Sequence, residues 1–396
     1  MKSPEYSYIY LDHNATTPVD PTAARAMISF MNEEFGNPSS PYFLGRRAKE
    51  ALEHSRNEVA LLLGCMSDEI IFTSGGSESN NAVLKGIIDI KRPENFHIIT
   101  SAVEHPAILN PVLFLMESGV GVTILSVDRF GQVDPDEVRR AIRPKTSLIS
   151  IMLANNETGT LQPIKEISKI AREHDILLHT DAAQAVGKIP VDVKELGVDF
   201  LSVAGHKLYG PKGVGALFIK DGRSITPLIH GAGQERGKRA GTESVILSIG
   251  IGVACKIAGQ RLKEDIRDME IFRDRLQELL FNGIDGIVLN GHSEERLPNT
   301  LNISVPGIEG GQVLEGLPTL LASTGAACHD RSVKLSHVLS AMSVPPEVGM
   351  GTLRLTVGRS NTMEEIEEAA MLLVNRVREL REGPGFYAQS SDHSAK

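Results

Sequence analysis

The chain has 396 residues, of which 41% are hydrophobic and 23% are charged, and its formal net charge is −9. This length favours one large and one smaller domain, and the composition is typical of a globular protein with a full core. An acidic chain without a Lys/Arg-rich run is not expected to have nucleic acid as its principal partner. No continuous apolar run approaches about 18 residues, so we expect no membrane-spanning helix.

The first ten residues and the cysteines bear on the cellular location. The amino terminus shows neither the apolar region of a signal peptide nor an Arg-rich transit pattern. Cys65, Cys255 and Cys328 are too few for a disulfide framework, and no Cys/His pairs have zinc-site spacing. We therefore expect a cytoplasmic protein without a metal site. Cys65 and Cys255 are interpreted as buried small hydrophobic residues.

In chain order, residues 9–18 are predicted to form a short strand and a turn. Residues 21–31 and 44–63 have helical patterns, and Gly64 is expected to end the second helix. Between residues 70 and 220, apolar runs of strand length alternate with helical stretches, which predicts a mostly parallel sheet with helices on both faces. The runs begin near Ile70, His97, Val122, Ser147, Ile176, Val198 and Val214.

The last part of the chain is expected to link and build the smaller domain. Residues 246–281 are largely helical, with interruptions expected at Gly250, Gly252 and Gly259. A strand near 296–305, a loop at 321–330, an alternating strand at 351–359 and a final helix to about residue 381 follow. We expect a large domain over 16–260, a smaller α+β domain formed by 1–15 and 261–381, and a disordered tail over 382–396.

Polar residues follow several of the predicted strands. The carboxyl ends of parallel strands gather at one edge of a sheet, and binding sites form there. We therefore expect these residues to form one site, and they are Gly76, His105, Asn156, Asp181 and Lys207.

Two of these residues predict a cofactor. Lys207 directly follows His206 in a glycine-rich loop, where burial and a neighbouring cation can lower the pKa of a lysine and make its amine nucleophilic. Asp181 ends an earlier buried run. An acid in this place pairs with the pyridinium nitrogen of pyridoxal 5'-phosphate (PLP), and a lysine after a later strand forms the Schiff base.

Three further segments carry candidate chemistry. Gly75, Gly76 and Ser77 form a turn before a helix, where bare amides and the helix dipole favour phosphate. Arg354 is an inward-pointing arginine on a strand, and such a residue is expected to meet an anion. Cys328 lies in a loop of small residues, where nearby cations can keep it as a thiolate.

From about Tyr10 to about Arg381, the sequence resembles the cysteine desulfurase and selenocysteine lyase family of class-V aminotransferase-like, fold-type I PLP enzymes. The resemblance implies an α/β fold with a mostly parallel seven-stranded sheet and a smaller α+β domain. It also implies that Lys207 binds PLP and takes the substrate's α-proton, and that His105 stacks on the ring and moves protons. The remaining cofactor contacts that it implies are Gly75, Gly76, Ser77, Asn156, Asp181, Gln184, His206 and Thr242.

The family pattern also implies the substrate contacts and the partners. Arg354 would bind the substrate carboxylate, with Asn14 and Asn156 nearby, and Cys328 would take sulfur from L-cysteine as a persulfide for an acceptor protein. Thr242 would reach the phosphate bound by the neighbouring subunit of a homodimer. Iron–sulfur cluster assembly or thiolation would then use the sulfur.

Two alternatives stay open from the sequence. Ala204 replaces a serine that many cysteine desulfurases use for phosphate, so His206 and Ser77 would contribute more, and selenocysteine lyases also lack that serine. A selenocysteine lyase is therefore the first alternative, also favoured by residues 296–300 and 326–329. A degenerate, non-catalytic binding protein is the second alternative. An aminotransferase is disfavoured because the resemblance extends through the Cys328 loop.

Overall fold

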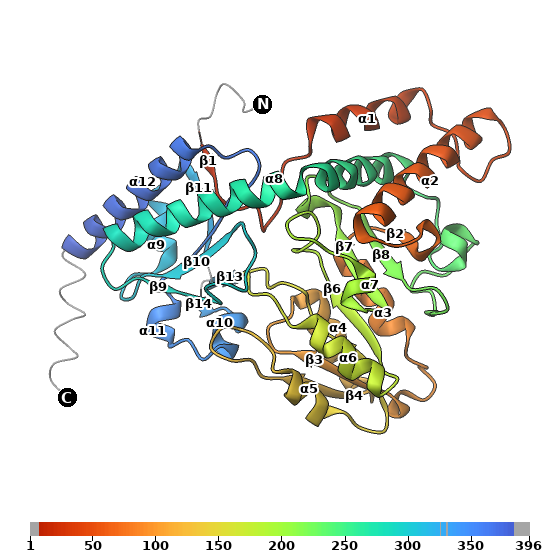
Figure 1. Ribbon diagram of the computed structural model, residues 1–396, viewed down its shortest axis with the longest axis horizontal. Helices are drawn as coiled ribbons and strands as arrows, with labels where there is room; N and C mark the ends of the chain where they lie inside the picture. The colour runs from red at the N-terminus through yellow and green to blue at the C-terminus, as the bar shows by residue number, and fades with distance from the viewer. Residues whose placement is uncertain (1–7, 325, 330–331, 384–396) are drawn as a thin grey trace.

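The computed structural model describes residues 8–324, 326–329 and 332–383, and Figure 1 shows them arranged around two groups of strands connected by the long helix α8. The larger sheet has seven strands in the order β2-β8-β7-β6-β5-β3-β4. β8 is antiparallel to β2 and β7, and the other neighbours are parallel. This confirms the predicted mostly parallel seven-stranded sheet. The strands are β2 Ile70–Thr73, β3 His97–Ser101, β4 Gly121–Leu125, β5 Thr146–Ser150, β6 Leu177–Asp181, β7 Phe200–Ala204 and β8 Gly215–Ile219.

The large sheet is buried on both faces. Successive residues of a strand point to opposite sides, so Leu148 and Phe200 join one apolar cluster while Ile149 and Leu201 join another. Such two-sided burial explains why the strands appear in the sequence as continuous apolar runs. The helices that connect them are α3 Gly76–Gly86, α4 Pro106–Glu117, α5 Pro135–Ala141, α6 Ile164–Glu173 and α7 Val193–Leu196.

Helix α8, Val245–Gly283, runs without a break past α1 (Pro21–Asn32), α2 (Phe43–Leu63) and α12 (Met363–Glu382). The interruptions expected at its glycines were therefore wrong. A Cβ on Gly250 would lie 2.7 Å from Met27 and Pro211, and one on Gly252 would lie 2.6 Å from Ser55. These glycines permit close packing and do not end the helix.

By length and composition alone, α8 is the one helix among the described residues that could cross a membrane. Lys256 interrupts its apolar sequence, which is why no continuous apolar run appears there. In the structure α8 packs along other helices, and its buried residues include Ile251, Ala254 and Cys255. We therefore interpret α8 as a core helix.

A four-stranded sheet with the order β12-β15-β10-β9 lies at the other end of α8. The amino-terminal strand β1 pairs with β11, and Ile9 and Leu11 join the apolar core of this region. The predicted domain boundaries at 15, 260 and 381 stay a prediction. The elements here are β1 Ile9–Tyr10, β9 Val288–Leu289, β10 Thr300–Ser304, α9 Gly310–Glu315, β11 Leu320–Leu321, β12 Ser323–Thr324, β13 Ala326–His329, β14 Ser332–Leu335, α10 His337–Ala341, α11 Pro346–Gly349 and β15 Thr352–Thr356.

Candidate active site

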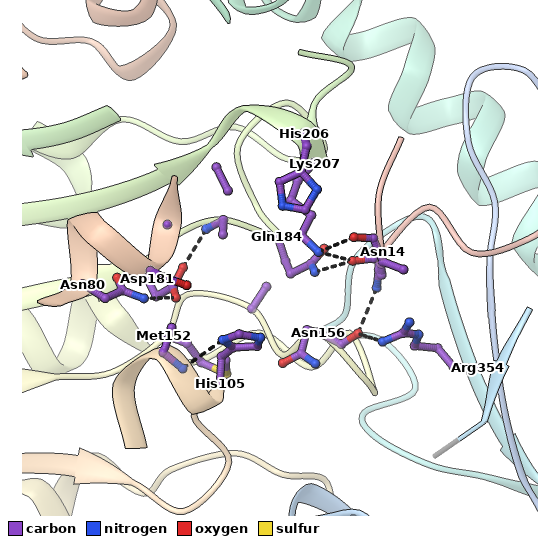
Figure 2. A pocket seen from close by; sticks show the side chains of 17 residues that line it. Asn14, Asn80, His105, Met152, Asn156, Asp181, Gln184, His206, Lys207 and Arg354 are labelled. Atoms are coloured by element: carbon purple, nitrogen blue, oxygen red, sulfur yellow. Dashed lines mark hydrogen bonds between the residues drawn. The ribbon is translucent and has the colours of Figure 1, made fainter. Parts of the chain in front are cut away.

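A cavity of about 380 Å³ lies where the polypeptide leaves the carboxyl ends of β5, β6 and β7, and segments from both ends of the chain close it (Figure 2). Most of the predicted residues line this cavity, whereas Gly75 and Thr242 do not. The predicted residues on its wall are Asn14, Gly76, Ser77, His105, Asn156, Asp181, Gln184, His206, Lys207 and Arg354.

Lys207 follows β7 in a short 3₁₀ turn, Gly205–Lys207. Its Nζ donates hydrogen bonds to the backbone oxygens of Asn14 (2.5 Å) and Ala15 (2.8 Å). Burial, with a smaller contribution from Arg354, lowers the pKa of Lys207 from 10.5 to about 8. This shift raises the fraction of neutral amine at pH 7 roughly 300-fold, so the residue is prepared to act as a nucleophile or a base.

Asp181 ends β6, and its carboxylate is held on both oxygens. Oδ2 accepts a hydrogen bond from Asn80 Nδ2 at 2.6 Å, and Oδ1 accepts one from the backbone N–H of Ala183 at 2.9 Å. The side chain is largely buried, with 8% of its surface exposed. A fixed buried carboxylate of this kind is suited to pair with a cation inside the cavity.

His105 is the N-cap of α4. Its Nδ1 accepts a hydrogen bond from the backbone N–H of Ala107 at 3.1 Å, so the ring proton resides on Nε2. Burial is the main cause that lowers the pKa of His105. The residue therefore lines the cavity as a neutral imidazole with one N–H to donate.

Two amide side chains complete this part of the wall. Asn156 Oδ1 is buried and has no hydrogen-bond partner among the described residues. Gln184 Nε2 donates to the backbone oxygen of Asn14 at 2.9 Å. A buried polar atom without a partner is costly, which indicates that Asn156 Oδ1 serves to bind a group in the cavity.

The amino terminus of α3 faces the same cavity through Gly76 and Ser77. Gly75, the N-cap, has a φ of 150°, a conformation that favours glycine. The first amides of a helix have no partner within it and bind anions readily. His206 lies on the other side, where its Nδ1 is 3.1 Å from Thr16 Oγ1, and burial followed by Lys207 lowers its pKa to about 4.

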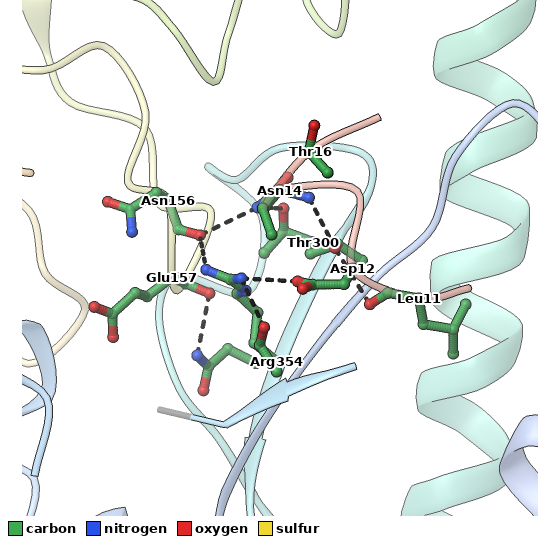
Figure 3. Close-up of polar contacts among 12 residues, drawn as sticks. Leu11, Asp12, Asn14, Thr16, Asn156, Glu157, Thr300 and Arg354 are labelled. Atoms are coloured by element: carbon green, nitrogen blue, oxygen red, sulfur yellow. Dashed lines mark hydrogen bonds and ion pairs between the residues drawn. The ribbon is translucent and has the colours of Figure 1, made fainter. Parts of the chain in front are cut away.

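Arg354 on β15 meets an anion of the protein itself (Figure 3). Its guanidinium is 2.8 Å from Asp12 Oδ1, and it also donates to Ser323 Oγ and to the backbone oxygen of Asn156. The inward-pointing arginine was predicted correctly, but the sequence did not indicate Asp12 as its partner. Arg354 Nε remains buried without a partner in the described structure, so the guanidinium keeps one unused donor.

Asn14 shapes the cavity mainly through its backbone. Its side-chain oxygen accepts from Lys188 and Asn299, and its Nδ2 donates to Thr300 Oγ1 and more weakly to the backbone oxygen of Asn156. The amide is therefore fully committed within the protein. The backbone oxygen of Asn14 is what faces Lys207 and Gln184.

Known proteins resemble this chain over nearly its whole length. Residues 9–369 match the family described as aminotransferase class-V. Cysteine desulfurases IscS from Dictyoglomus turgidum and Methanosarcina thermophila are each 48% identical, covering 94% and 96% of this chain and 95% and 94% of their own. A solved NifS-like protein has a TM-score of 0.88 at 37% identity and covers 94% of this chain and 99% of its own. The chain belongs to the class-V aminotransferase family, among the cysteine desulfurases.

Cys328 of this cysteine desulfurase family member belongs to strand β13. Its backbone pairs with Val333 in the β13–β14 hairpin, and its side chain lies outside the described residues. Ser336, which directly follows the hairpin, is tethered next to the cavity wall, because its Oγ donates at 2.5 Å to Oε2 of Glu157, the chain neighbour of the lining residue Asn156. His337 Nε2 lies 2.9 Å from the backbone oxygen of Glu104.

Sequence reasoning missed Asn80 and Glu157. Asn80 lies four residues after Gly76, one turn into α3, and this spacing from the glycine turn could have placed it toward Asp181. Glu157 has no signal of its own in the sequence, and in the structure it anchors Ser336. Cys255 is buried as predicted, whereas Cys65 is only partly buried.

Proposed function

We propose that this protein is a PLP-dependent cysteine desulfurase that converts L-cysteine to L-alanine and transfers the sulfur to Cys328. The observation that carries the proposal is the cavity that brings Lys207, Asp181 and His105 together in a member of this family. These three residues are far apart in the sequence, and the seven-stranded sheet is what brings them together. A non-catalytic relative would not need to keep a lysine with a pKa of about 8 in a cavity.

The residues present fit PLP. Lys207 offers the amine that holds the aldehyde carbon, and Asp181 offers the carboxylate for the pyridinium nitrogen. The α3 amino terminus, with Gly75, Gly76 and Ser77 around it, offers amides for the phosphate. The unpaired Oδ1 of Asn156 can bind a group in the cavity. Gln184 and His206 are the remaining polar side chains proposed to contact the cofactor.

When bound, PLP supplies an electron sink that stabilises negative charge on the α-carbon of the substrate. Lys207 Nζ is placed to accept the α-proton, since its lowered pKa lets the amine be neutral near pH 7 to 8. His105 Nε2 holds a second mobile proton. Arg354 orients the substrate through its carboxylate, which then shares the guanidinium with Asp12 or displaces it.

Cys328 takes the sulfur in a step that needs no outside oxidant. The thiolate attacks the substrate sulfur, an S–S bond forms, and the bond between that sulfur and the β-carbon breaks. The electron pair stays on the substrate carbon, which gains a proton and becomes the methyl group of alanine. The persulfide on Cys328 is then passed to a sulfur-acceptor protein.

A homodimer is part of this proposal. Thr242 is exposed and does not line the cavity of its own chain, as expected for a residue that reaches the phosphate in a neighbouring subunit. Large apolar side chains around α1 and the start of α2 are exposed by 53% to 70%, which is typical of a surface that another chain covers. They are Ile28, Met31, Phe35, Tyr42 and Phe43. A cytoplasmic location stays a prediction.

The test is to load the protein with PLP and, with a thiol reductant present to release sulfide from the persulfide, measure alanine and sulfide from L-cysteine, and alanine and selenide from L-selenocysteine. We expect comparable wild-type rates on both substrates, and loss of the sulfide rate in Cys328→Ala. The buried Cys255→Ala is the matched control and should keep its rate. A strong preference for selenocysteine, with little sulfide from wild type, would instead establish a selenocysteine lyase, the alternative that Ala204 favours.

A further inference from the structure

Lys188 is a second buried lysine beside the candidate active site, and none of the roles above uses it. It follows Gly187 in the short loop after β6, and 5% of its surface is exposed. Its Nζ donates to Gln184 Oε1 at 2.8 Å and to Asn14 Oδ1 at 2.9 Å. Both acceptors belong to residues that line the cavity.

Nothing around Lys188 neutralises its charge by direct contact in the described structure. Burial, followed by the nearby cations Lys207 and Arg354, lowers the pKa of Lys188 well below the usual range. Its other side faces an internal cavity of about 10 Å³, room for about one water and too small for a larger anion. The titratable and charged residues that share this small cavity with Lys188 are His13, Tyr209, Asp265 and Arg359.

A buried amine without a paired anion is costly, so its placement calls for a reason. A lysine amine has at least two hydrogens whether it is charged or neutral, and two acceptors use them. The bonds at Lys188 therefore do not depend on its protonation state. They turn the oxygens of both amide side chains toward Lys188.

The orientation of Gln184 follows from these bonds. Because Oε1 faces Lys188, Nε2 must face the other way, where one hydrogen binds the backbone oxygen of Asn14. The second hydrogen of that NH₂ group is available to a group in the cavity. That same backbone oxygen of Asn14 accepts from Lys207, so all four residues belong to one hydrogen-bond network.

Gln184 Nε2 and Lys207 Nζ share the backbone oxygen of Asn14, so the amide lies beside the amine that would hold the aldehyde carbon of PLP, and the phenolic oxygen is attached to the neighbouring ring carbon. We propose that Lys188 is a positioning residue that fixes the Gln184 amide so that it presents N–H, and not C=O, to this phenolic oxygen. This inference rests on the proposed function. An N–H donor stabilises the oxygen as an anion, whereas a carbonyl in the same place repels it. Without Lys188, only the bond from Nε2 to the backbone oxygen of Asn14 opposes rotation of the amide by half a turn, so the flipped orientation becomes more populated.

The experiment measures the pH midpoint of the visible absorption band of the PLP-loaded enzyme in four proteins: wild type, Lys188→Met, Gln184→Leu and the double variant. Methionine keeps the length of lysine and removes its donors. We expect Lys188→Met to raise the midpoint by about half to one pH unit, the size expected for one lost hydrogen bond. The double variant should shift no further than Gln184→Leu alone, because Lys188 acts through Gln184.

Arg273→Met is the matched control. Arg273 is also a buried cation, and it binds the backbone oxygen of Leu297 away from the cavity wall. Its loss should lower the melting temperature and leave the pH midpoint unchanged. If Lys188→Met folds poorly, Lys188→Gln, which retains two amide hydrogens, should fold and restore a midpoint near that of wild type.

Three results would overturn the inference. A Lys188→Met midpoint equal to that of wild type means that the lysine only fills space, and shifts that add in the double variant mean that its charge acts directly. A Lys188→Gln protein that folds and shifts as far as Lys188→Met means that donation is irrelevant. Absence of any visible band from wild type would instead contradict the proposed function itself.

Discussion

The two walls of the cavity are held in different ways. On the wall made by the seven-stranded sheet, Asp181 ends a strand, Lys207 follows one, and His105 caps the helix that comes after one. On the opposite wall, Arg354 is placed by Asp12, Ser323 and the backbone of Asn156, which are far from it in sequence. The backbone of the first wall is therefore positioned by the sheet itself, and the second wall depends on segments that pack together from both ends of the chain.

This difference matters for what each wall can do. Residues at strand ends are held in one geometry by a core buried on both faces, which suits groups that act on the reacting atoms. Arg354 already binds an anion of the protein, and the hairpin that carries Cys328 is tethered at Ser336. Contacts of this kind can be exchanged for substrate contacts. We expect substitutions on the first wall to change the chemical step and those on the second to change substrate binding.

The largest expected effect is on the sheet wall. Asp181→Asn keeps the shape of the side chain and removes the charge that would pair with the cofactor nitrogen, so kcat should fall by roughly 10³-fold with a smaller change in KM. Steady-state kinetics on L-cysteine measures it. A loss of less than tenfold would mean that this wall is not the catalytic one.

Arg354→Gln tests the opposite wall. Removal of a charged partner from the substrate carboxylate should raise KM for L-cysteine by roughly 10- to 100-fold, while kcat changes less. Arg359→Gln is the control, because Arg359 pairs with Asp265 and stacks on Tyr209 outside the cavity wall. A fall in kcat with KM unchanged would contradict the assignment of Arg354 to binding.

The lowered pKa of Lys207 predicts a pH-dependent stability of the cofactor-free protein. Below pH 8, Lys207 is protonated in both states and the folded protein bears the full cost of burying its charge. Between about pH 8 and 10.5 the unfolded chain binds more protons, so this cost, roughly 2 to 3 kcal/mol, is relieved as the pH rises.

The comparison that isolates this effect is with Lys207→Met. Denaturant unfolding of the cofactor-free proteins measures the free energy of unfolding. The difference between wild type and variant should shift in favour of wild type by roughly 2 to 3 kcal/mol from pH 7 to pH 10. Lys165→Met replaces an exposed lysine, so its free energy of unfolding should change with pH in the same way as that of wild type. Parallel curves for Lys207→Met would mean that Lys207 has an ordinary pKa.

The smallest expected effect is at Asp12. Asp12→Asn removes the anion that competes with the substrate carboxylate for Arg354, so KM for L-cysteine should fall by roughly three- to tenfold with little change in kcat. The same kinetic assay resolves it. A higher KM would show that Asp12 orients the guanidinium more than it competes for it.

The same contrast explains how far the sequence could be interpreted. The strand-end rule was enough to place His105, Asp181 and Lys207 in one site from the sequence alone, because each follows an apolar run that a parallel sheet aligns. The Asp12–Arg354 pair has no such signal, because 342 positions separate its members. They are joined because β1 and β15 pack into one core and because the segment after β1 pairs with the end of β15, where the backbone N–H of Thr356 donates to the backbone oxygen of Leu11 at 2.8 Å.

Lys188 and α8 show a second limit. Lys188 lies in a Gly-Lys-Ile-Pro stretch that is typical of an exposed turn, yet the structure buries it beneath Gln184. The glycines of α8 suggested interruptions, and they are instead sites where α2 and Pro211 approach the helix. In both cases the deciding contact is made by a distant segment, which local propensity does not describe.

The presence of two buried lysines beside one cavity makes a single measurement decisive. The PLP-loaded protein is reduced with borohydride, digested, and searched by mass spectrometry for the lysine that carries the cofactor. We expect one modified residue, Lys207. Modification of Lys188 in place of Lys207, or of no lysine at all, would contradict it.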